Sequence, residues 1–265
     1  MKDFCVLGSG ISGSNIANLL KKNYTVEIFD KAKGLGGRCS NRRYKNRLSF
    51  DHGLQYISPK NKKFSSFLKS LVHKKVFKEW KGTHLNLKDT SKETKKFIGV
   101  KGNNDISKYL VKNVKVNSQS KITKIIFNSN HWIVIANNKK HFFKNLILTC
   151  PYPQIKPLAK KYLGKNFFNL NVNMQPNITV LIAFKGYQNT PISSIKFKDD
   201  ILGWCANENS KKRFNSNLNL WTIQSNVKWA KKYINKCKDK KITVINKLLD
   251  RFCFLTGFDK KNVVF

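Results

Sequence analysis

The apolar positions of the chain occur in short runs whose spacing alternates between that of strands and that of helices. An apolar run at residues 3–7 precedes a glycine-rich turn, and the segment after the turn carries Ile16, Leu19 and Leu20 on one helical face. A β-rich run follows at residues 24–30. Strand, glycine turn, helix and strand in this order predict a βαβ unit at the start of the chain.

The same reasoning predicts elements along the rest of the chain. Alternation across residues 120–150, with a central Asn-Ser-Asn turn, predicts a hairpin followed by another strand. Three prolines within residues 150–158 predict an interruption of regular structure. Further helices are expected near residues 64–71 and 105–113, and further strands at residues 177–187 and 218–225. A last helix, ended by Gly257, is expected to bury Val244, Ile245, Leu248, Leu249 and Phe252.

Composition indicates a folded protein with an unusual charge. Of the 265 residues, 40% are hydrophobic and 12% aromatic, which excludes a disordered chain. The formal net charge of +38 would suit nucleic acid or an anionic membrane surface. The lysines are nevertheless spread over every segment, with examples at Lys60, Lys95, Lys139, Lys160, Lys211 and Lys240. Compositional bias is therefore the preferred interpretation, and no specific nucleic acid is predicted as a partner.

The chain shows no sign of membrane insertion or of disulfide and metal chemistry. No apolar stretch reaches the roughly 20 residues of a membrane-spanning helix, and the first apolar run is too short for a signal-peptide core. The six cysteines have irregular gaps and no C-x-x-C pair, which favours free thiols over a disulfide framework or zinc site. We therefore expect a cytoplasmic protein without a bound metal.

The first turn carries a recognisable glycine pattern. Gly8, Gly10 and Gly13 form G-x-G-x-x-G between the first strand and the first helix, and Asp30 ends the second strand. The first glycine permits the tight turn, the second lets a pyrophosphate approach the main chain, and the third allows close helix–strand packing. An acid at the end of the second strand can accept hydrogen bonds from a ribose. The pattern predicts a dinucleotide site.

Four of the six arginines lie in one short segment behind this unit. Gly36, Gly37 and Arg38 follow Asp30 by six to eight residues. Two glycines would let the chain pass close to a diphosphate, and an arginine offers a forked donor to phosphate or flavin oxygens. An acid followed by Gly-Gly-Arg resembles the second signature of flavoproteins of the amine oxidase superfamily.

The resemblance narrows in residues 36–56, GGRCSNRRYKNRLSFDHGLQY, which are similar to the renalase-like branch of that superfamily. It implies non-covalently bound FAD, with residues 53–56 alongside the flavin ring, Ser12 near the diphosphate and the main chain of Ile122 near the adenine. The glycine pattern and the resemblance together predict these cofactor-binding residues: Gly8, Ser9, Gly10, Ile11, Ser12, Gly13, Asp30, Lys31, Gly36, Gly37, Arg38, Arg43, Gly53, Leu54, Gln55, Tyr56 and Ile122.

The expected fold class is α/β, a Rossmann-type FAD/NAD(P)-binding domain with a smaller, sheet-containing substrate domain. The FAD-binding domain is expected to be discontinuous, at residues 1–59, 98–164 and 229–265, with the substrate domain at residues 60–97 and 165–228. The resemblance implies an oxidoreductase that passes a hydride from a small, anionic substrate to the flavin, which dioxygen reoxidises. The substrate would be a reduced nicotinamide dinucleotide isomer or an amine.

Members of this family continue beyond the point that matches Phe265, with segments that complete the flavin site. The chain is therefore expected to be C-terminally truncated, with a separate C-terminal fragment as a candidate partner. Two alternatives stay open, an incomplete, inactive remnant of the flavin fold and a basic nucleic-acid-binding protein. His52, beside Asp51, is the candidate acid–base residue, although packing or hydrogen bonding near the ring is the competing interpretation. No other catalytic residue is assigned.

Overall fold

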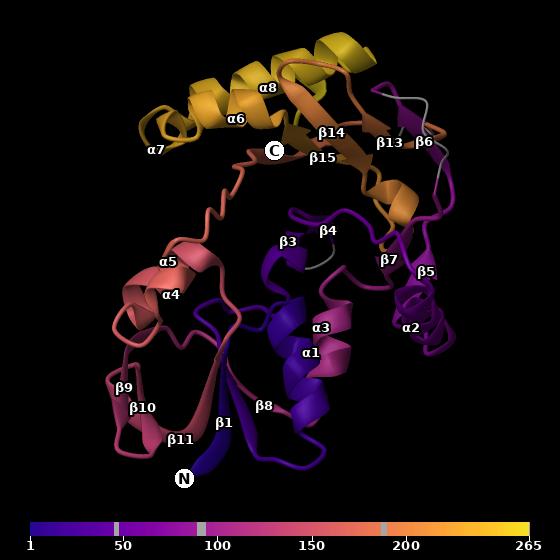
Figure 1. Ribbon diagram of the computed structural model, residues 1–265. Helices are drawn as coiled ribbons and strands as arrows, with labels where there is room; N and C mark the ends of the chain where they lie inside the picture. Colours follow the sequence, from indigo (N-terminus) through magenta and orange to yellow (C-terminus); the bar gives the residue numbers. More distant parts are fainter. Residues whose placement is uncertain (45–47, 89–93, 187–189, 265) are drawn as a thin grey trace. The chain divides into compact units, whose positions relative to one another are not determined.

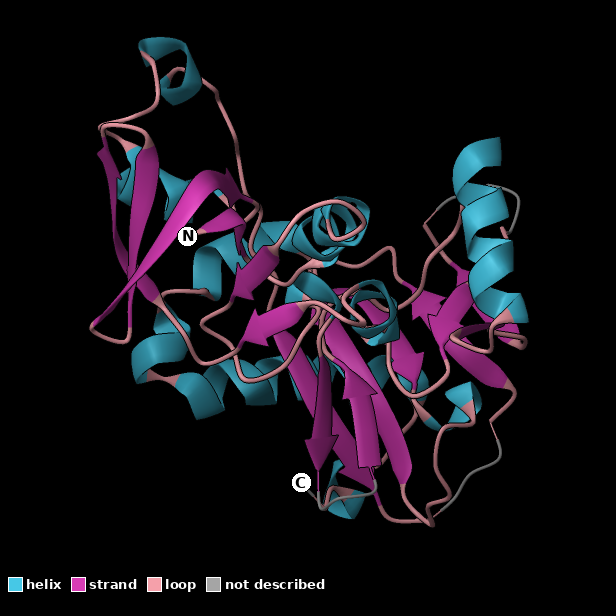
Figure 2. Cartoon of the chain, turned by 90° about the horizontal axis from the view of Figure 1, so that it is seen from below, coloured by secondary structure: helices cyan, strands magenta, loops and turns pink. Residues whose placement is uncertain are grey.

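The computed structural model describes residues 1–44, 48–88, 94–186 and 190–264 (Figure 1). The chain divides into two compact units. Unit 1 consists of Met1–Ser40 and Asn104–Asn173, and unit 2 of Asn41–Asn103 and Met174–Phe265. Each unit is built around its own sheet, and the strands appear as magenta arrows in Figure 2.

Unit 1 contains a six-stranded sheet in the order β8-β2-β1-β11-β10-β9. The pairs β8–β2, β2–β1 and β1–β11 are parallel, whereas β11, β10 and β9 form an antiparallel meander. The predicted βαβ unit and the predicted hairpin with its third strand are both confirmed. The elements are β1 (Lys2–Leu7), α1 (Ile11–Leu20), β2 (Val26–Phe29), η1 (Gly37–Cys39), α3 (Asp105–Leu110), β8 (Lys115–Asn117), β9 (Ile122–Asn128), β10 (His131–Ala136), β11 (Lys139–Leu148), α4 (Tyr152–Ala159) and α5 (Lys165–Phe168).

Helix α1 packs through small residues, and α3 lies beside it (Figure 1). Its buried residues are Gly13, Ser14 and Ala17. Of the three residues expected on one helical face, Ile16 and Leu20 pack against the core, whereas Leu19 is 55% exposed. The close approach of helix and strand at the glycine turn selects small side chains, and Leu19 lies about 200° around the helix from Ala17, on the other side.

The predicted interruption at residues 150–158 is also wrong, because α4 forms there. Pro151 is the N-cap and Pro153 lies in the first turn, where a helix needs no N–H donor. Pro157 falls in the last turn of this eight-residue helix, so only a single helical hydrogen bond is lost. The position of the prolines, rather than their number, decides whether a short helix tolerates them.

Unit 2 contains a five-stranded sheet in the order β12-β15-β14-β13-β6, together with two small two-stranded sheets, β3–β4 and β5–β7. The strands are β3 (Asn41–Tyr44), β4 (Leu48–Asp51), β5 (Phe77–Glu79), β6 (Thr83–Asn86), β7 (Phe97–Gly99), β12 (Thr179–Phe184), β13 (Ile192–Lys196), β14 (Leu202–Asn207) and β15 (Asn219–Ser225). The helices are α2 (Lys62–His73), η2 (Asn209–Lys211), α6 (Val227–Tyr233), α7 (Lys236–Asp239), α8 (Lys241–Thr256) and η3 (Lys260–Asn262).

Helix α8 lies against β14 and β15 and closes the main core of unit 2 (Figure 1). As predicted, it buries Val244, Leu248, Leu249 and Phe252, with Ile245 partly buried, and Gly257 ends it in a left-handed conformation with φ 75°. Phe252 packs with Trp221 and Phe258. No helix within the described residues is long and apolar enough to cross a membrane.

The compact units differ from the expected domain division. Residues 41–59, 98–103 and 229–265 were assigned to the FAD-binding domain but lie in unit 2, and residues 165–173 lie in unit 1. Packing explains the difference. Leu48 and Phe50 of β4 share a buried cluster with Ala183 and Leu220 of the unit 2 sheet, and α8 packs on the same sheet.

Candidate functional site

The glycine turn of unit 1 forms an open cradle at the N-terminus of α1. A Cβ at Gly13 would lie 2.0 Å from the carbonyl oxygen of Gly8, so only glycine fits there. Gly8 has a φ of 104°, which also favours glycine. A Cβ at Gly10, in contrast, would meet no atom within 4 Å. The helix has no side-chain N-cap and no acidic residue in its first turn, so its N–H groups and its positive dipole end face this space.

The second glycine pair folds back onto the first turn. Gly36 donates its main-chain N–H to the Ser9 carbonyl at 3.1 Å and forms an isolated parallel bridge with Gly10. Gly36 has a φ of 111°, and a Cβ there would lie 2.7 Å from Asn104 Cβ. A Cβ at Gly37 would approach Gly10 Cα to 3.2 Å. Two motifs distant in the sequence therefore form one cradle, which fits the diphosphate of a dinucleotide.

Asp30 closes this cradle from the end of β2. Its Oδ2 accepts the main-chain N–H of Ser9 at 2.7 Å and the Ser9 hydroxyl at 2.6 Å, and its Oδ1 accepts the N–H of Ala32 at 2.8 Å. A carboxylate has about four lone-pair directions, so one stays available for a ribose hydroxyl. Ser9 is completely buried, and its hydroxyl fixes the orientation of the acid.

The remaining predicted residues of unit 1 differ in exposure. Ile11 and Ser12 are exposed in the first turn of α1, Lys31 is exposed after β2, and Arg38 is exposed within η1. Ile122 begins β9 and is 7% exposed. Arg43 is exposed on β3 and Gly53, Leu54, Gln55 and Tyr56 follow β4, so these five predicted residues belong to unit 2. Arg47 lies outside the described residues.

A buried group of charges surrounds Asp51 at the end of β4 in unit 2. Asp51 Oδ2 accepts from Lys211 Nζ at 2.9 Å and from Arg213 Nη1 at 2.5 Å. Lys211 Nζ also bonds Glu208 Oε1 at 3.0 Å and Gln55 Oε1 at 3.2 Å. The side chains of Asp51, Glu208 and Lys211 are fully buried. We refer to Asp51, Gln55, Glu208, Lys211 and Arg213 as the Lys211 cluster.

The two carboxylates of the cluster are perturbed in opposite directions. Burial alone would raise the pKa of Asp51, but the charges of Lys211 and Arg213 and the N–H of Asn103 outweigh burial and hold that pKa well below its usual range. For Glu208, burial dominates and the negative charge of Asp51 adds to it, so its pKa is raised. Lys211 pairs with both acids, whereas Arg213 pairs with Asp51, so Asp51 is the acid that stays ionised.

Sequence reasoning did not find this cluster. Lys211 was named only as one of the lysines spread along the chain, and it is 1% exposed. The segment 207–213 reads NENSKKR, a polar run typical of a solvated loop. Asn207 accepts the N–H groups of Asn209 and Ser210 and so tightens this run into η2, which turns Lys211 inward. The one local signal was Glu208, three residues before Lys211.

His52 and Tyr56 lie on either side of Gln55 in the segment that follows β4. His52 is exposed, and partial burial of its ring lowers its pKa more than the charge of Asp51 raises it, so it is neutral at pH 7. Tyr56 packs against Trp204 with ring centroids 5.4 Å apart and against Trp80 at 6.5 Å. The ammonium of Lys96 lies 5.4 Å from the Tyr56 ring centroid. A largely buried aromatic cluster with one lysine therefore adjoins residues 53–56.

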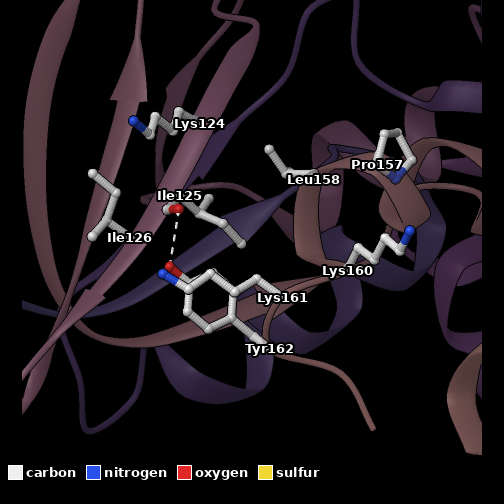
Figure 3. Close-up of a pocket in the computed structure, with 8 residues that line it drawn as sticks. All are labelled: Lys124, Ile125, Ile126, Pro157, Leu158, Lys160, Lys161 and Tyr162. Atoms are coloured by element: carbon white, nitrogen blue, oxygen red, sulfur yellow. Dashed lines mark hydrogen bonds between the residues drawn. The ribbon is translucent and has the colours of Figure 1, made fainter. Parts of the chain in front are cut away.

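Unit 1 also has a surface cavity of about 590 Å³ between β9 and the segment formed by α4 and the residues after it. Figure 3 shows Tyr162 beneath it, with its hydroxyl directed at the Ile125 carbonyl. That hydroxyl also accepts the N–H of Phe127 at 3.1 Å. None of the predicted cofactor residues lines the cavity; the residues that do are Lys124, Ile125, Ile126, Pro157, Leu158, Lys160, Lys161 and Tyr162.

Metal and thiol chemistry find no support in the described residues. No group of three or more His, Cys, Asp or Glu side chains there could hold a metal ion. All six cysteines are free, and burial raises the pKa of the Cys5 and Cys205 thiols far above the usual range. Cys5 is a fully buried strand residue, as expected for a small hydrophobe.

Comparison with known proteins agrees with the cradle and the fold. Residues 6–71 match the NAD(P)-binding Rossmann-like domain family. Solved structures with a similar fold include wild-type putrescine oxidase bound to putrescine (TM-score 0.66, 11% identity, 93% of this chain and 80% of that one). Another is an oxidoreductase from Methanosarcina mazei (TM-score 0.66, 12% identity, 93% of this chain and 84% of that one). The chain therefore shares its fold with these two oxidoreductase structures.

In sequence the chain is similar to renalase of Mus musculus, with 29% identity over 170 residues. The match covers 60% of this chain, and it spans about half (49%) of the mouse protein. The mixed α/β fold and the Rossmann-like domain that were predicted are confirmed.

Proposed function

We propose that this chain is an FAD-dependent oxidoreductase that holds its cofactor non-covalently. The observation that carries the proposal is the double glycine cradle, where Gly10 leaves open space beside an uncapped helix N-terminus. The proposed diphosphate contacts are the main-chain N–H groups of Gly10–Gly13 with Gly36, Gly37 and Arg38, and Asp30 would bond the ribose. The similarity to renalase supports FAD over NAD as the dinucleotide.

Residues of unit 2 are proposed to contact the flavin ring and the substrate. FAD, when bound, supplies the hydride acceptor, and dioxygen would then restore its oxidised form. Gly53–Tyr56 would line the ring, and the exposed Arg42 and Arg43 would attract an anionic substrate. We propose a reduced nicotinamide dinucleotide isomer as that substrate, with an amine as the second candidate. Neutral His52 adjoins this segment, so it is the proposed residue to test for proton transfer.

The visible absorption spectrum of the purified chain, with any released cofactor identified by mass spectrometry, tests the proposal. A yellow protein that releases FAD is expected. Gly13→Ala is the matched variant, because its added Cβ would lie 2.0 Å from the Gly8 carbonyl and distort the cradle. Gly164→Ala is its control, since a Cβ there meets nothing within 4 Å. A colourless wild-type chain that does not take up added FAD would contradict the proposal.

A further inference from the structure

Lys211 is saturated with acceptors inside unit 2. An ammonium group has three N–H donors, and Nζ lies 2.9 Å from Asp51 Oδ2, 3.0 Å from Glu208 Oε1 and 3.2 Å from Gln55 Oε1. The face of the Trp80 ring, centred 5.2 Å from Nζ, covers another side. A lysine held in this way has no lone pair to offer to a substrate. The contacts of Lys211 therefore indicate that it positions its neighbours. Of these neighbours, Gln55 is the one that also bonds the main chain of residues 51 and 53.

Gln55 connects Lys211 to the main chain of the segment proposed to line the flavin. Its Nε2 donates to the carbonyl oxygen of Asp51 and, at 3.3 Å, to that of Gly53. Gln224 Nε2 donates to the same Gly53 oxygen at 2.9 Å, and Asn103 Nδ2 donates to the carbonyl oxygen of Leu54 at 2.7 Å. Side chains therefore occupy the main-chain acceptors of residues 51, 53 and 54.

The main-chain donors of the same segment are left open. Within the part of the chain that the structure describes, the N–H groups of His52, Gly53 and Leu54 have no hydrogen-bond acceptor. Residues 52–54 therefore form a donor-rich strip, in which main-chain N–H groups are open beside carbonyl groups that are already hydrogen-bonded. Such a strip suits the electron-rich ring heteroatoms of a ligand. Gln55 supplies the side-chain bond to the Asp51 carbonyl and shares the Gly53 carbonyl with Gln224, so the strip loses part of this character if the Gln55 amide turns.

We propose that Lys211 is a positioning residue for this strip, acting through Gln55, and that it thereby sets the affinity and the absorption spectrum of bound flavin. The inference rests on the proposed FAD function. Lys211 touches neither substrate nor cofactor in this scheme. Lys211 fixes the amide of Gln55. Without Lys211, Oε1 and Nε2 of Gln55 would be free to exchange places, so that the Asp51 carbonyl would lose its Gln55 donor and the Gly53 carbonyl would keep that of Gln224.

The test uses the charge-balanced double variant Lys211→Met/Glu208→Gln in the full chain. Lys211→Met alone would leave two carboxylates facing one arginine, whereas the double variant leaves the Asp51–Arg213 pair intact. Lys212→Met, at the exposed neighbouring lysine, is the control. Three quantities are measured: the solvent-exchange rate of the Gln55 side-chain amide by NMR without FAD, the dissociation constant for added FAD, and the position of the visible flavin bands.

We expect the double variant to speed Gln55 amide exchange and to weaken FAD binding, each by roughly tenfold, the effect of losing one hydrogen bond to a charged group. Its flavin bands should shift, while Lys212→Met matches the wild type. Unchanged Gln55 exchange would overturn the inference, and so would faster exchange with unchanged FAD affinity and spectrum. A wild-type chain that binds no FAD would overturn the proposed function and this inference together, which separates the two failures.

Discussion

Replacing Asp51 by asparagine should cost far more stability than the same replacement at an exposed ion pair. Asp51→Asn preserves the shape of the side chain but removes the charge that faces Lys211 Nζ at 2.9 Å and Arg213 Nη1 at 2.5 Å. Breaking a buried ion pair by removing one partner costs about 3–5 kcal/mol, because the remaining charge is left uncompensated. Glu208 can ionise to compensate Lys211, so the expected loss is at the low end of this range, about 3 kcal/mol.

The matched control is Asp250→Asn, since Asp250 pairs with Lys260 and the two side chains are 57% and 45% exposed. An exposed pair contributes at most about 1 kcal/mol. Thermal unfolding followed by tryptophan fluorescence suits the comparison, because Trp80, Trp204, Trp221 and Trp229 lie in unit 2. For a chain of this size, about 3 kcal/mol corresponds to a fall in Tm of roughly 6–12 °C. Equal Tm values for the two variants would refute the reasoning that the buried charges stabilise unit 2.

Three further predictions follow from the same geometry. Glu208→Gln should be tolerated at pH 7, because the raised pKa of Glu208 means that the fold prefers the neutral acid. In urea titrations, the stability of the wild type should fall relative to this variant as pH rises above 4.5. A loss of stability as large as that of Asp51→Asn would contradict the prediction. The pH dependence of stability has the opposite sign for Asp51. Its lowered pKa stabilises the fold at pH values above the ordinary pKa of 3.8, and this contribution is lost as pH falls below 3.8. Acid unfolding of Asp51→Asn should therefore start from lower stability and show a shallower pH dependence than that of the wild type. Gly36→Ala should weaken FAD binding by tenfold or more, because its φ of 111° and the 2.7 Å approach to Asn104 Cβ would displace the chain from Gly10; calorimetric titration with FAD measures the change, and unaltered affinity would argue against the cradle.

The glycine cradle could be predicted because its signals are local. The strand, the three glycines and Asp30 occur within the first 30 residues, and each has a steric or hydrogen-bonding reason that the structure displays. Lys211 could not be predicted in this way. Its partner Asp51 is 160 residues away, and nothing local separates it from other lysines in polar runs. Burial of a charge is decided by tertiary packing, so residue type alone carries no sign of it.

Helix α4 shows a related limit at shorter range. Counting three prolines predicted a break, whereas their places at the N-cap, in the first turn and in the last turn are compatible with one short helix. In α1 the helical pattern is only partly followed, because Ile16 and Leu20 pack against the core while Leu19 is exposed. The glycine turn and the small residues Ser14 and Ala17 set the centre of the packed face. Periodicity located the buried side of α8 well and that of α1 only approximately.

The Tyr162 hydroxyl covers part of the exposed edge of the unit 1 sheet. Strand β9 is the last strand of the unit 1 sheet, and an outer strand offers unpaired main-chain groups to any other strand. The Tyr162 hydroxyl accepts the main-chain N–H of Phe127 and donates to the main-chain carbonyl of Ile125, so it occupies one donor and one acceptor of this edge strand. Lys124 on the same strand adds a charge that repels a like strand. Together, the Tyr162 hydroxyl and Lys124 protect this edge strand from pairing with a strand of another chain.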